Sequence, residues 1–256
     1  MSDLNRNAIR YGTAVRRTGA EIDQGLRSYM LAVYNYMAVG LAITGAAALG
    51  VYMLAVSDTA TPYAIGSIYL TDFGYTLFVS PLKWVVMLAP LGAVFFLSFR
   101  VNSMSVPAAQ AVFWAYAGLV GVSLSTIFLF YTHDSIVRVF FITAASFGAL
   151  SLYGYTTTRS LSGMGSFLIM GLFGIIIASL VNIFLGSSML QFVISVVGVL
   201  VFAGLTAYDT QRIKEMYFAG DDDVVAGRKA IMGALTLYLD FINMFMMMLQ
   251  LFGNRE

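Results

Sequence analysis

The sequence predicts an all-α integral membrane protein, built as a bundle of seven transmembrane helices. Of the 256 residues, 59% are apolar and only 11% are charged, whereas soluble domains carry about 25% charged residues. The apolar residues gather into seven runs that are uncharged except at Arg138 and Asp240. Each run except the second is long enough to cross roughly 30 Å of hydrocarbon as a helix.

The predicted helices cover residues 29–56, 84–99, 108–131, 136–155, 164–185, 189–208 and 230–252. The second helix is short and contains Pro90, which predicts a kink. Lys83 and Arg100, which flank it, can extend their charges to the two membrane surfaces. Residues 57–82 mix apolar and polar side chains in runs too short to span a bilayer. We therefore expect these residues to form an interfacial loop.

The charged residues predict the topology. Residues 1–28 are polar and arginine-rich and form a predicted cytoplasmic tail, and residues 29–256 form the transmembrane domain. The first apolar run is too long for the core of a signal peptide, so we expect it to be retained. Cytoplasmic loops are rich in Lys and Arg, and an N-terminus in the cytoplasm puts eleven basic residues inside and three outside. Seven full crossings then place the C-terminus outside, whereas a re-entrant last segment would place it inside.

Several classes of function are excluded by what the sequence lacks. There is no cysteine, which excludes disulfides, thiol catalysis and cysteine metal sites, and a single histidine leaves no histidine cluster for zinc. A net charge of +1 gives no reason to expect a nucleic-acid partner. No lysine lies in the middle of a predicted helix, so a retinal Schiff base is not expected. We expect that the protein is not an enzyme and needs no cofactor. Its expected partner is the lipid bilayer.

One charged residue, Asp240, lies near the middle of the last predicted helix. A carboxylate at this depth costs roughly 2.5 to 3.5 kcal/mol on insertion scales, so it needs a partner or a proton. Asp209 ends the preceding apolar run, and two neighbouring antiparallel helices would bring the two acids together. That arrangement suits a proton or cation switch. For the pair to meet, the last helix must start in the cytosol or tilt strongly, because Asp240 lies much farther from its nearest basic flank than Asp209 does.

A polar stripe follows one face of the last predicted helix. Its members recur at steps of three or four residues, which places them on one helical face: Gly233, Thr236, Asp240, Asn243 and Met247. Lipid cannot satisfy their hydrogen bonds, so we expect the stripe to face the bundle interior and to line a pore. Close helix contacts are expected at small residues of the first and fifth predicted helices, Ala46, Gly50, Gly171 and Gly174.

The two acids lie in motifs that resemble a known family. Residues 206–214, TAYDTQRIK, and residues 237–245, LYLDFINMF, resemble the end of the Bax-inhibitor-1 family, also called the TMBIM family, and are similar to its bacterial members. These motifs lie within about the last fifth of the chain. The resemblance implies a bundle with the seventh helix at its centre, a location in the inner membrane, a paired-aspartate pH sensor at Asp209 and Asp240, and a calcium leak.

The chemistry of two adjacent carboxyl groups supports a sensor independently of the resemblance. Two buried carboxylates within a few ångströms of each other cannot both ionise cheaply, so they share a proton or take up a cation. Calcium prefers six to eight oxygen ligands, and Asp209, Asp240, Asn243 and water offer it a transient site. When both acids are ionised, we expect a basic residue to hold them as a latch, with Arg100 as the first choice and Arg212 as the second.

Other interpretations remain open at this point. Asp209 can be an ordinary helix-end partner of Arg212, and Asp240 can be a structural carboxylic acid bonded to a neighbouring backbone group. The chain can also be a non-conducting scaffold that modulates a membrane protease or a stress or death pathway. Calcium flux in liposomes that contain only this chain would separate the scaffold from the leak.

Overall fold

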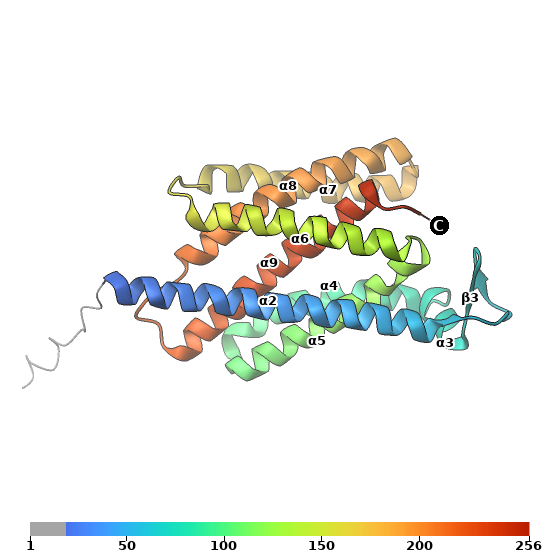
Figure 1. The fold of residues 1–256 in the computed structure, drawn as a ribbon, viewed down its shortest axis with the longest axis horizontal. Helices are drawn as coiled ribbons and strands as arrows, with labels where there is room; N and C mark the ends of the chain where they lie inside the picture. Colours follow the sequence, from blue (N-terminus) through green and yellow to red (C-terminus); the bar gives the residue numbers. More distant parts are fainter. Residues whose placement is uncertain (1–18, 256) are drawn as a thin grey trace, which may run out of the picture.

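The protein is a bundle of seven long helices in the computed structural model, which describes residues 19–255 (Figure 1). Within these residues, seven helices are long and apolar enough to cross a membrane, so the predicted all-α membrane protein with seven spanning helices is confirmed. They are α2 (Gly19–Ala55), α4 (Leu82–Arg100), α5 (Val106–Leu124), α6 (His133–Thr156), α7 (Ser162–Leu185), α8 (Ser188–Glu215) and α9 (Asp223–Phe252). Two short 3-10 helices, η1 (Val101–Ser103) and η2 (Ser125–Leu129), follow α4 and α5.

The observed helix ends differ from the predicted ones mainly where charged residues continue a helix beyond its apolar run. α8 ends at Glu215 instead of residue 208, and α9 begins at Asp223 instead of residue 230. α2 already includes Gly19, whereas the predicted helix begins at residue 29. Residues 1–18 of the predicted tail lie outside the described residues. Hydropathy marks the hydrocarbon depth and not the end of a helix, since Arg, Lys and Glu are good helix formers.

Side-chain caps explain where several helices start. Ser105, Thr132, Ser187 and Asp222 precede α5, α6, α8 and α9, and each accepts a hydrogen bond from a backbone N–H of the first turn. These caps satisfy donors that have no partner inside the helix. α7 ends at Leu185, and the next residue, Gly186, has a φ of +61°, in the left-handed region that glycine adopts without strain. The chain therefore reverses sharply between α7 and α8.

Glycines allow two pairs of helices to approach closely. A Cβ atom at Gly121 of α5 would lie 2.5 Å from a carbonyl oxygen of α2, and one at Gly154 of α6 would meet a carbonyl oxygen of α8. Among the small residues predicted at close contacts, Gly171 lies against Val201 of α8. Gly50 and Gly174 face open space, so the prediction of close contacts at these two positions is wrong.

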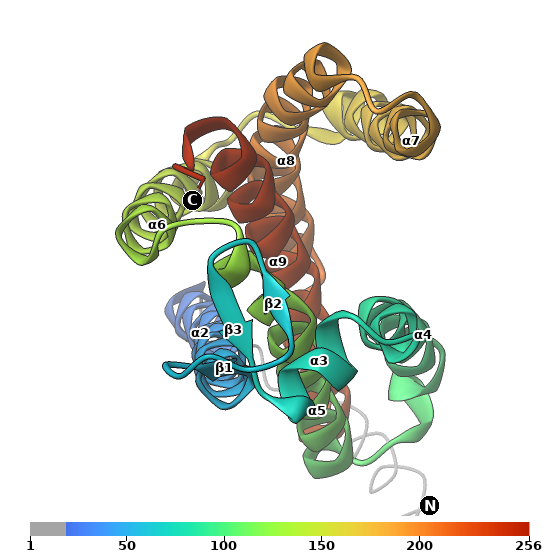
Figure 2. The same cartoon turned by 90° about the vertical axis from the view of Figure 1, so that its right-hand side faces the viewer.

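α9 packs against α2, α5, α6 and α8, and an end-on view shows it between α8 and the pair of α2 and α5 (Figure 2). Tyr238 anchors it, because its fully buried hydroxyl lies 2.6 Å from Oγ1 of Thr44 in α2. Thr44 also donates toward the carbonyl oxygen of Ala117 in α5. The rings of Phe113 and Tyr116 meet the Tyr238 ring edge-on. One side chain of α9 is thus held by two neighbouring helices.

Residues 56–78 form a small folded cap where the sequence predicts an interfacial loop. Three short strands, β1 (Val56–Ser57), β2 (Ala64–Ile65) and β3 (Ile68–Leu70), pair antiparallel in the order β1-β3-β2. The helix α3 (Asp72–Phe78) follows, capped by the side chain of Thr71. Apolar residues of the cap pack together against the ends of α2 and η2. Strands of two or three residues are too short to give a periodic signal in the sequence.

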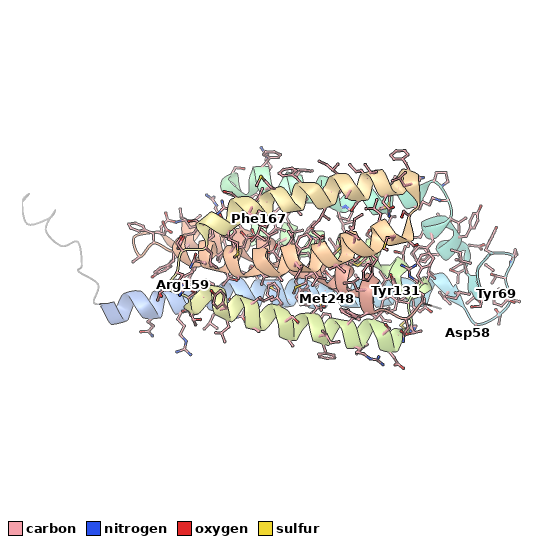
Figure 3. All side chains as sticks on the ribbon, turned by 90° about the horizontal axis from the view of Figure 1, so that it is seen from above. Asp58, Tyr69, Tyr131, Arg159, Phe167 and Met248 are labelled. Carbon is pink, nitrogen blue, oxygen red and sulfur yellow. The ribbon has the colours of Figure 1, made fainter. Side chains whose placement is uncertain are left out.

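The C-terminal residues lie at the end of the molecule opposite to the start of α2 (Figure 1). The backbone N–H of Thr132 donates to the carbonyl oxygen of Asn254 at 3.1 Å. The Arg255 guanidinium lies over the Tyr131 ring at 5.7 Å. Figure 3 shows Tyr131 at this end and Arg159 at the other. α9 therefore runs from one end of the bundle to the other.

Candidate functional site

Asp209 of α8 and Asp240 of α9 lie side by side inside the bundle. Their carboxyl groups are in hydrogen-bond contact, and only 9% of Asp209 and 5% of Asp240 is exposed. A hydrogen bond between two carboxyl groups needs one proton, because two carboxylates offer only acceptors. Among the described residues, no donor reaches the buried Oδ2 atom of Asp240. The geometry therefore provides a place for one proton between the two acids.

The length and direction of α9 explain how the two acids meet. At a rise of about 1.5 Å per residue, Asp240 lies about 25 Å along α9 from its start at Asp223. Asp209 lies much closer to the end of α8 at Glu215. The extra length before Asp240 is accounted for by the start of α9 at Asp223, before its apolar run, and by the oblique course of both α8 and α9 through the bundle (Figure 1). The sequence requires either a start in the cytosol or a strong tilt, and the structure shows α9 starting at Asp223 and running obliquely.

A cavity of about 310 Å³ opens beside the pair, between α7, α8 and α9. Both acids line it, together with Arg212 of α8 and the Thr236 and Asn243 side chains of α9. Thr236 and Asn243 each donate to a backbone carbonyl one turn earlier in α9. The amide oxygen of Asn243 keeps its acceptor sites, so the cavity wall carries carboxyl, hydroxyl and amide oxygens.

Two predicted members of the polar stripe lie elsewhere. A Cβ atom at Gly233 would lie 3.0 Å from Ile213 of α8 and 3.4 Å from Val33 of α2, so Gly233 is a packing position between these helices. The Met247 side chain crosses Gly198 of α8. Neither residue lines the cavity beside the acids. The stripe predicted as pore-lining thus faces a cavity at Thr236, Asp240 and Asn243 and a helix interface at its two ends.

The two predicted latch residues differ in position. Arg212 lines the cavity and interacts electrostatically with Asp209, but forms no ion pair within the described part of the chain. Arg100 ends α4 and is exposed. α4 packs mainly against α5, and Arg100 is not among the residues that line the cavity. The structure brings Arg212 to the acids and does not bring Arg100 to them, and the latch role of either residue stays a prediction.

The neighbours of Asp209 in the sequence hold the adjoining loop, a role that the sequence did not reveal. Gln211 accepts a hydrogen bond from the backbone N–H of Leu161 at 2.7 Å and donates to the carbonyl oxygen of Arg159 at 2.9 Å. Lys214 donates to the carbonyl oxygen of Tyr155. The motif around Asp209 therefore fixes the connection between α6 and α7 as well as presenting the acid.

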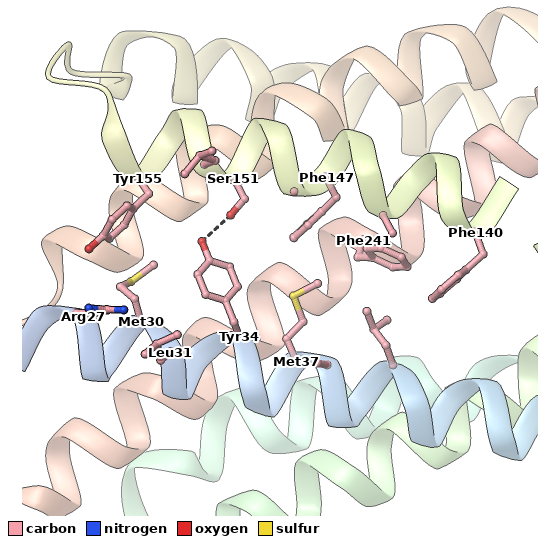
Figure 4. A pocket seen from close by; sticks show the side chains of 15 residues that line it. Arg27, Met30, Leu31, Tyr34, Met37, Phe140, Phe147, Ser151, Tyr155 and Phe241 are labelled. Carbon is pink, nitrogen blue, oxygen red and sulfur yellow. Dashed lines mark hydrogen bonds between the residues drawn. The ribbon is translucent and has the colours of Figure 1, made fainter. Parts of the chain in front are cut away.

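A chain of hydroxyl groups crosses from α2 to α8, one residue from Asp209. Tyr34 lies 2.7 Å from Ser151 of α6 (Figure 4), and Ser151 lies 2.9 Å from Thr210. Thr210 donates its proton to the carbonyl oxygen of Thr206. Each hydroxyl has one proton, so Ser151 donates to Thr210 and Tyr34 donates to Ser151. Because the chain ends on a backbone carbonyl, it joins helices and carries no proton to the acids.

A second polar cluster ties α7, α8 and α9 together near the end opposite to the start of α2. Gln250 accepts hydrogen bonds from Gln191 at 2.5 Å and from Ser195 at 2.8 Å, and Asn182 donates to Gln191 at 3.2 Å. Gln250 lies three residues after Met247 on the same face of α9 as the predicted stripe. The interface between α8 and α9 is therefore polar at both ends and apolar where Met247 crosses Gly198.

The acidic run before α9 has structural partners. Asp221 pairs with Lys229 at 2.6 Å, Asp222 caps the helix by accepting from the N–H of Val225, and Asp223 lies in the first turn, where a negative charge is favourable. Within the described residues, no group of three or more His, Asp or Glu side chains could hold a metal ion. A cation at the Asp209 and Asp240 pair would have to complete its ligands from amide oxygens and water.

Comparisons with known proteins agree with this architecture. The family model described as inhibitor of apoptosis-promoting Bax1 (Bax1-I) matches residues 26–256. An uncharacterised protein of Rickettsia prowazekii is 48% identical over 91% of this chain and 92% of its own length. An uncharacterised protein of Caulobacter vibrioides is 42% identical over the whole of both chains. The inner membrane protein YbhL of Escherichia coli is 43% identical over 91% of this chain and 94% of its own length. A match to the family over nearly the whole chain, with seven spanning helices in the structure, shows that the protein belongs to the Bax-inhibitor-1 family.

Proposed function

We propose that the protein is a pH-sensitive cation leak, with calcium among its cations, and that Asp209 and Asp240 form its sensor. The observation that carries the proposal is the buried contact between carboxyl groups of consecutive helices, beside a cavity of about 310 Å³. Two acids that share one proton change their charge together when the proton leaves. The cavity wall then carries two negative charges, which attract a cation.

The gating step follows from the cost of these charges. An uncompensated buried charge costs several kcal/mol even after its surroundings relax. Loss of the proton is therefore offset by separation of α8 from α9, by uptake of a cation, or by movement of Arg212 toward Asp209. Each response changes the shape or the charge of the cavity. The oxygen atoms that line it are fewer than calcium needs for tight binding, and weak binding suits conduction.

We further propose that the basic end of the bundle faces the cytoplasm of an inner membrane, with the C-terminus outside. The basic end is the end that carries Arg27, Arg159, Arg212, Lys214, Arg228 and Lys229. The excess of basic residues at this end supports the orientation, and the name of the Escherichia coli relative places that protein in the inner membrane. The contacts of α9 with four other spanning helices support a central position for it in the bundle.

Calcium flux into proteoliposomes that contain only the purified chain tests the proposal between about pH 5 and about pH 8. We expect a flux that varies with pH in the unmodified protein and in Asp58→Asn, which changes an exposed acid of the cap. In Asp240→Asn the variation should disappear. Absence of flux at every pH, from protein that is folded, would contradict the leak and favour a non-conducting scaffold.

A further inference from the structure

An apolar groove runs between α2 and α6 and shares no lining residue with the cavity beside the carboxyl pair. It consists of two cavities of about 780 and 500 Å³. They share the lining residues Ala38, Leu41, Phe140 and Phe241, so they form one continuous space. We call it the α2–α6 groove. Its floor comes from α9 at Phe241, and both of its walls are spanning helices, so it lies at the depth of the hydrocarbon.

The groove exists because its two walls pack on other helices and hardly on each other. α2 packs against α5 and α9, and α6 packs against α8 and α9. Gly148 of α6 and Gly45 of α2 line the two cavities, and a Cβ atom at either position would have no atom within 4 Å. Tyr34 and Ser151 bridge the two helices by a hydrogen bond inside the groove (Figure 4).

Most of the polar lining of the groove belongs to its larger cavity, with Arg27, Tyr34, Ser151 and Tyr155, and the charged residue lies at the basic end of the bundle. Figure 4 shows Arg27 and Tyr155 at one end, next to Tyr34 and Ser151, and Phe140 at the other. The Arg27 guanidinium makes no hydrogen bond or ion pair with any residue whose side chain the structure describes. A cationic group at the mouth of an apolar groove, at membrane depth, matches a molecule with an anionic head and an apolar tail.

We infer that the α2–α6 groove binds one glycerophospholipid from the leaflet at the basic end, with its phosphate at Arg27 and an acyl chain along Phe147, Phe241 and Phe140. The charge at the mouth favours a phosphate-bearing lipid over an uncharged one. The larger cavity, about 780 Å³, falls within the range of about 300–1,000 Å³ that is typical of small-molecule sites. A soluble polar ligand is excluded, because the groove opens to hydrocarbon and offers few hydrogen-bonding groups along its length.

The test fills the groove with a side chain. In Gly148→Phe the new ring enters open space, so it should occupy the acyl-chain position without displacing a neighbour. Gly174→Phe is the matched control, because Gly174 lies on α7, outside the groove, and is equally open. Native mass spectrometry of protein in detergent with added phosphatidylglycerol should show one tightly held lipid for the unmodified chain and the control, and none for Gly148→Phe. If Gly148→Phe does not fold, Gly45→Phe fills the second cavity and replaces it.

A second comparison tests the headgroup. Arg27→Gln should weaken phosphatidylglycerol binding about fivefold, which corresponds to one basic residue near an anionic headgroup. It should leave the binding of diacylglycerol, which has the chains without the phosphate, unchanged. Arg159→Gln, at the same end of the bundle but outside the groove lining, should change neither. Retention of phosphatidylglycerol by the filled variants would overturn the site, and equal weakening of both lipids in Arg27→Gln would overturn the phosphate contact. Neither readout depends on ion flux.

Discussion

Removing Tyr238 or Thr44 from their shared hydrogen bond should lower the free energy of unfolding by different amounts. Two carbonyl oxygens, those of Gly40 at 3.0 Å and Ala117 at 2.9 Å, accept from the Thr44 hydroxyl, so Tyr238 donates to Thr44 at 2.6 Å. Tyr238→Phe removes that donor and leaves the Thr44 proton satisfied. Thr44→Val, which keeps the side-chain shape, leaves the Tyr238 proton buried without its acceptor.

The geometry decides which group is left without a partner, and general values for such groups give the expected costs. Side-chain hydrogen bonds between membrane helices average about 0.6 kcal/mol, so Tyr238→Phe should lower the free energy of unfolding by about that amount. A buried donor left unsatisfied costs about 1–3 kcal/mol, so Thr44→Val should cost more. Equilibrium unfolding in mixed micelles, monitored for both variants and their combination, measures the two costs and their coupling. Equal costs, or a larger cost for Tyr238→Phe, would refute the assigned direction of this hydrogen bond.

Two further predictions concern packing and the counter-charge. Gly121→Ala should destabilise the protein by about 1–3 kcal/mol, because the added methyl group meets a backbone carbonyl of α2. Gly118→Ala, three residues earlier on α5, adds a methyl group 3.9 Å from Ile43 and should be nearly neutral in the same unfolding assay. Equal costs would argue against the close contact. Arg212→Gln should move the pH midpoint of calcium flux upward, because the ionised pair loses its neighbouring positive charge. Arg100→Gln should leave the midpoint unchanged. A midpoint that moves in Arg100→Gln and not in Arg212→Gln would identify Arg100 as the latch.

The sequence predicts the spanning helices well, because hydrocarbon demands long apolar runs and charged residues interrupt them. Asp209 and Asp240 could be paired from the sequence on two grounds, the cost of a charge at membrane depth and the resemblance of the two motifs. Their contact depends on how far α8 and α9 extend beyond their apolar runs. Hydropathy does not record that extension, so the predicted ends at residues 208 and 230 fall short.

Other features depend on which faces of the helices meet. Gly50 and Gly174 are as small as Gly121 and Gly154, but only the last two lie where another backbone approaches. The pattern of small residues does not distinguish these cases. The position of Arg100 at a helix end predicts a latch, but the packing of α4 against α5 determines where Arg100 lies relative to α8. The hydroxyl chain of Tyr34, Ser151 and Thr210 links three helices that are distant in the sequence, so no local sequence pattern predicts it.

The most direct test of the shared-proton sensor is calcium flux in proteoliposomes for Asp209→Asn, Asp240→Asn and the double variant, each compared with the unmodified protein between about pH 5 and about pH 8. Asparagine resembles a carboxyl group that cannot lose its proton. Each single variant should therefore hold the flux, at every pH, at the value that the unmodified protein reaches at the acid limit. The double variant should add nothing to either single change, because the two acids act as one unit. A folded single variant that keeps the full pH dependence, or a double variant whose effect is the sum of the two, would contradict the shared-proton sensor.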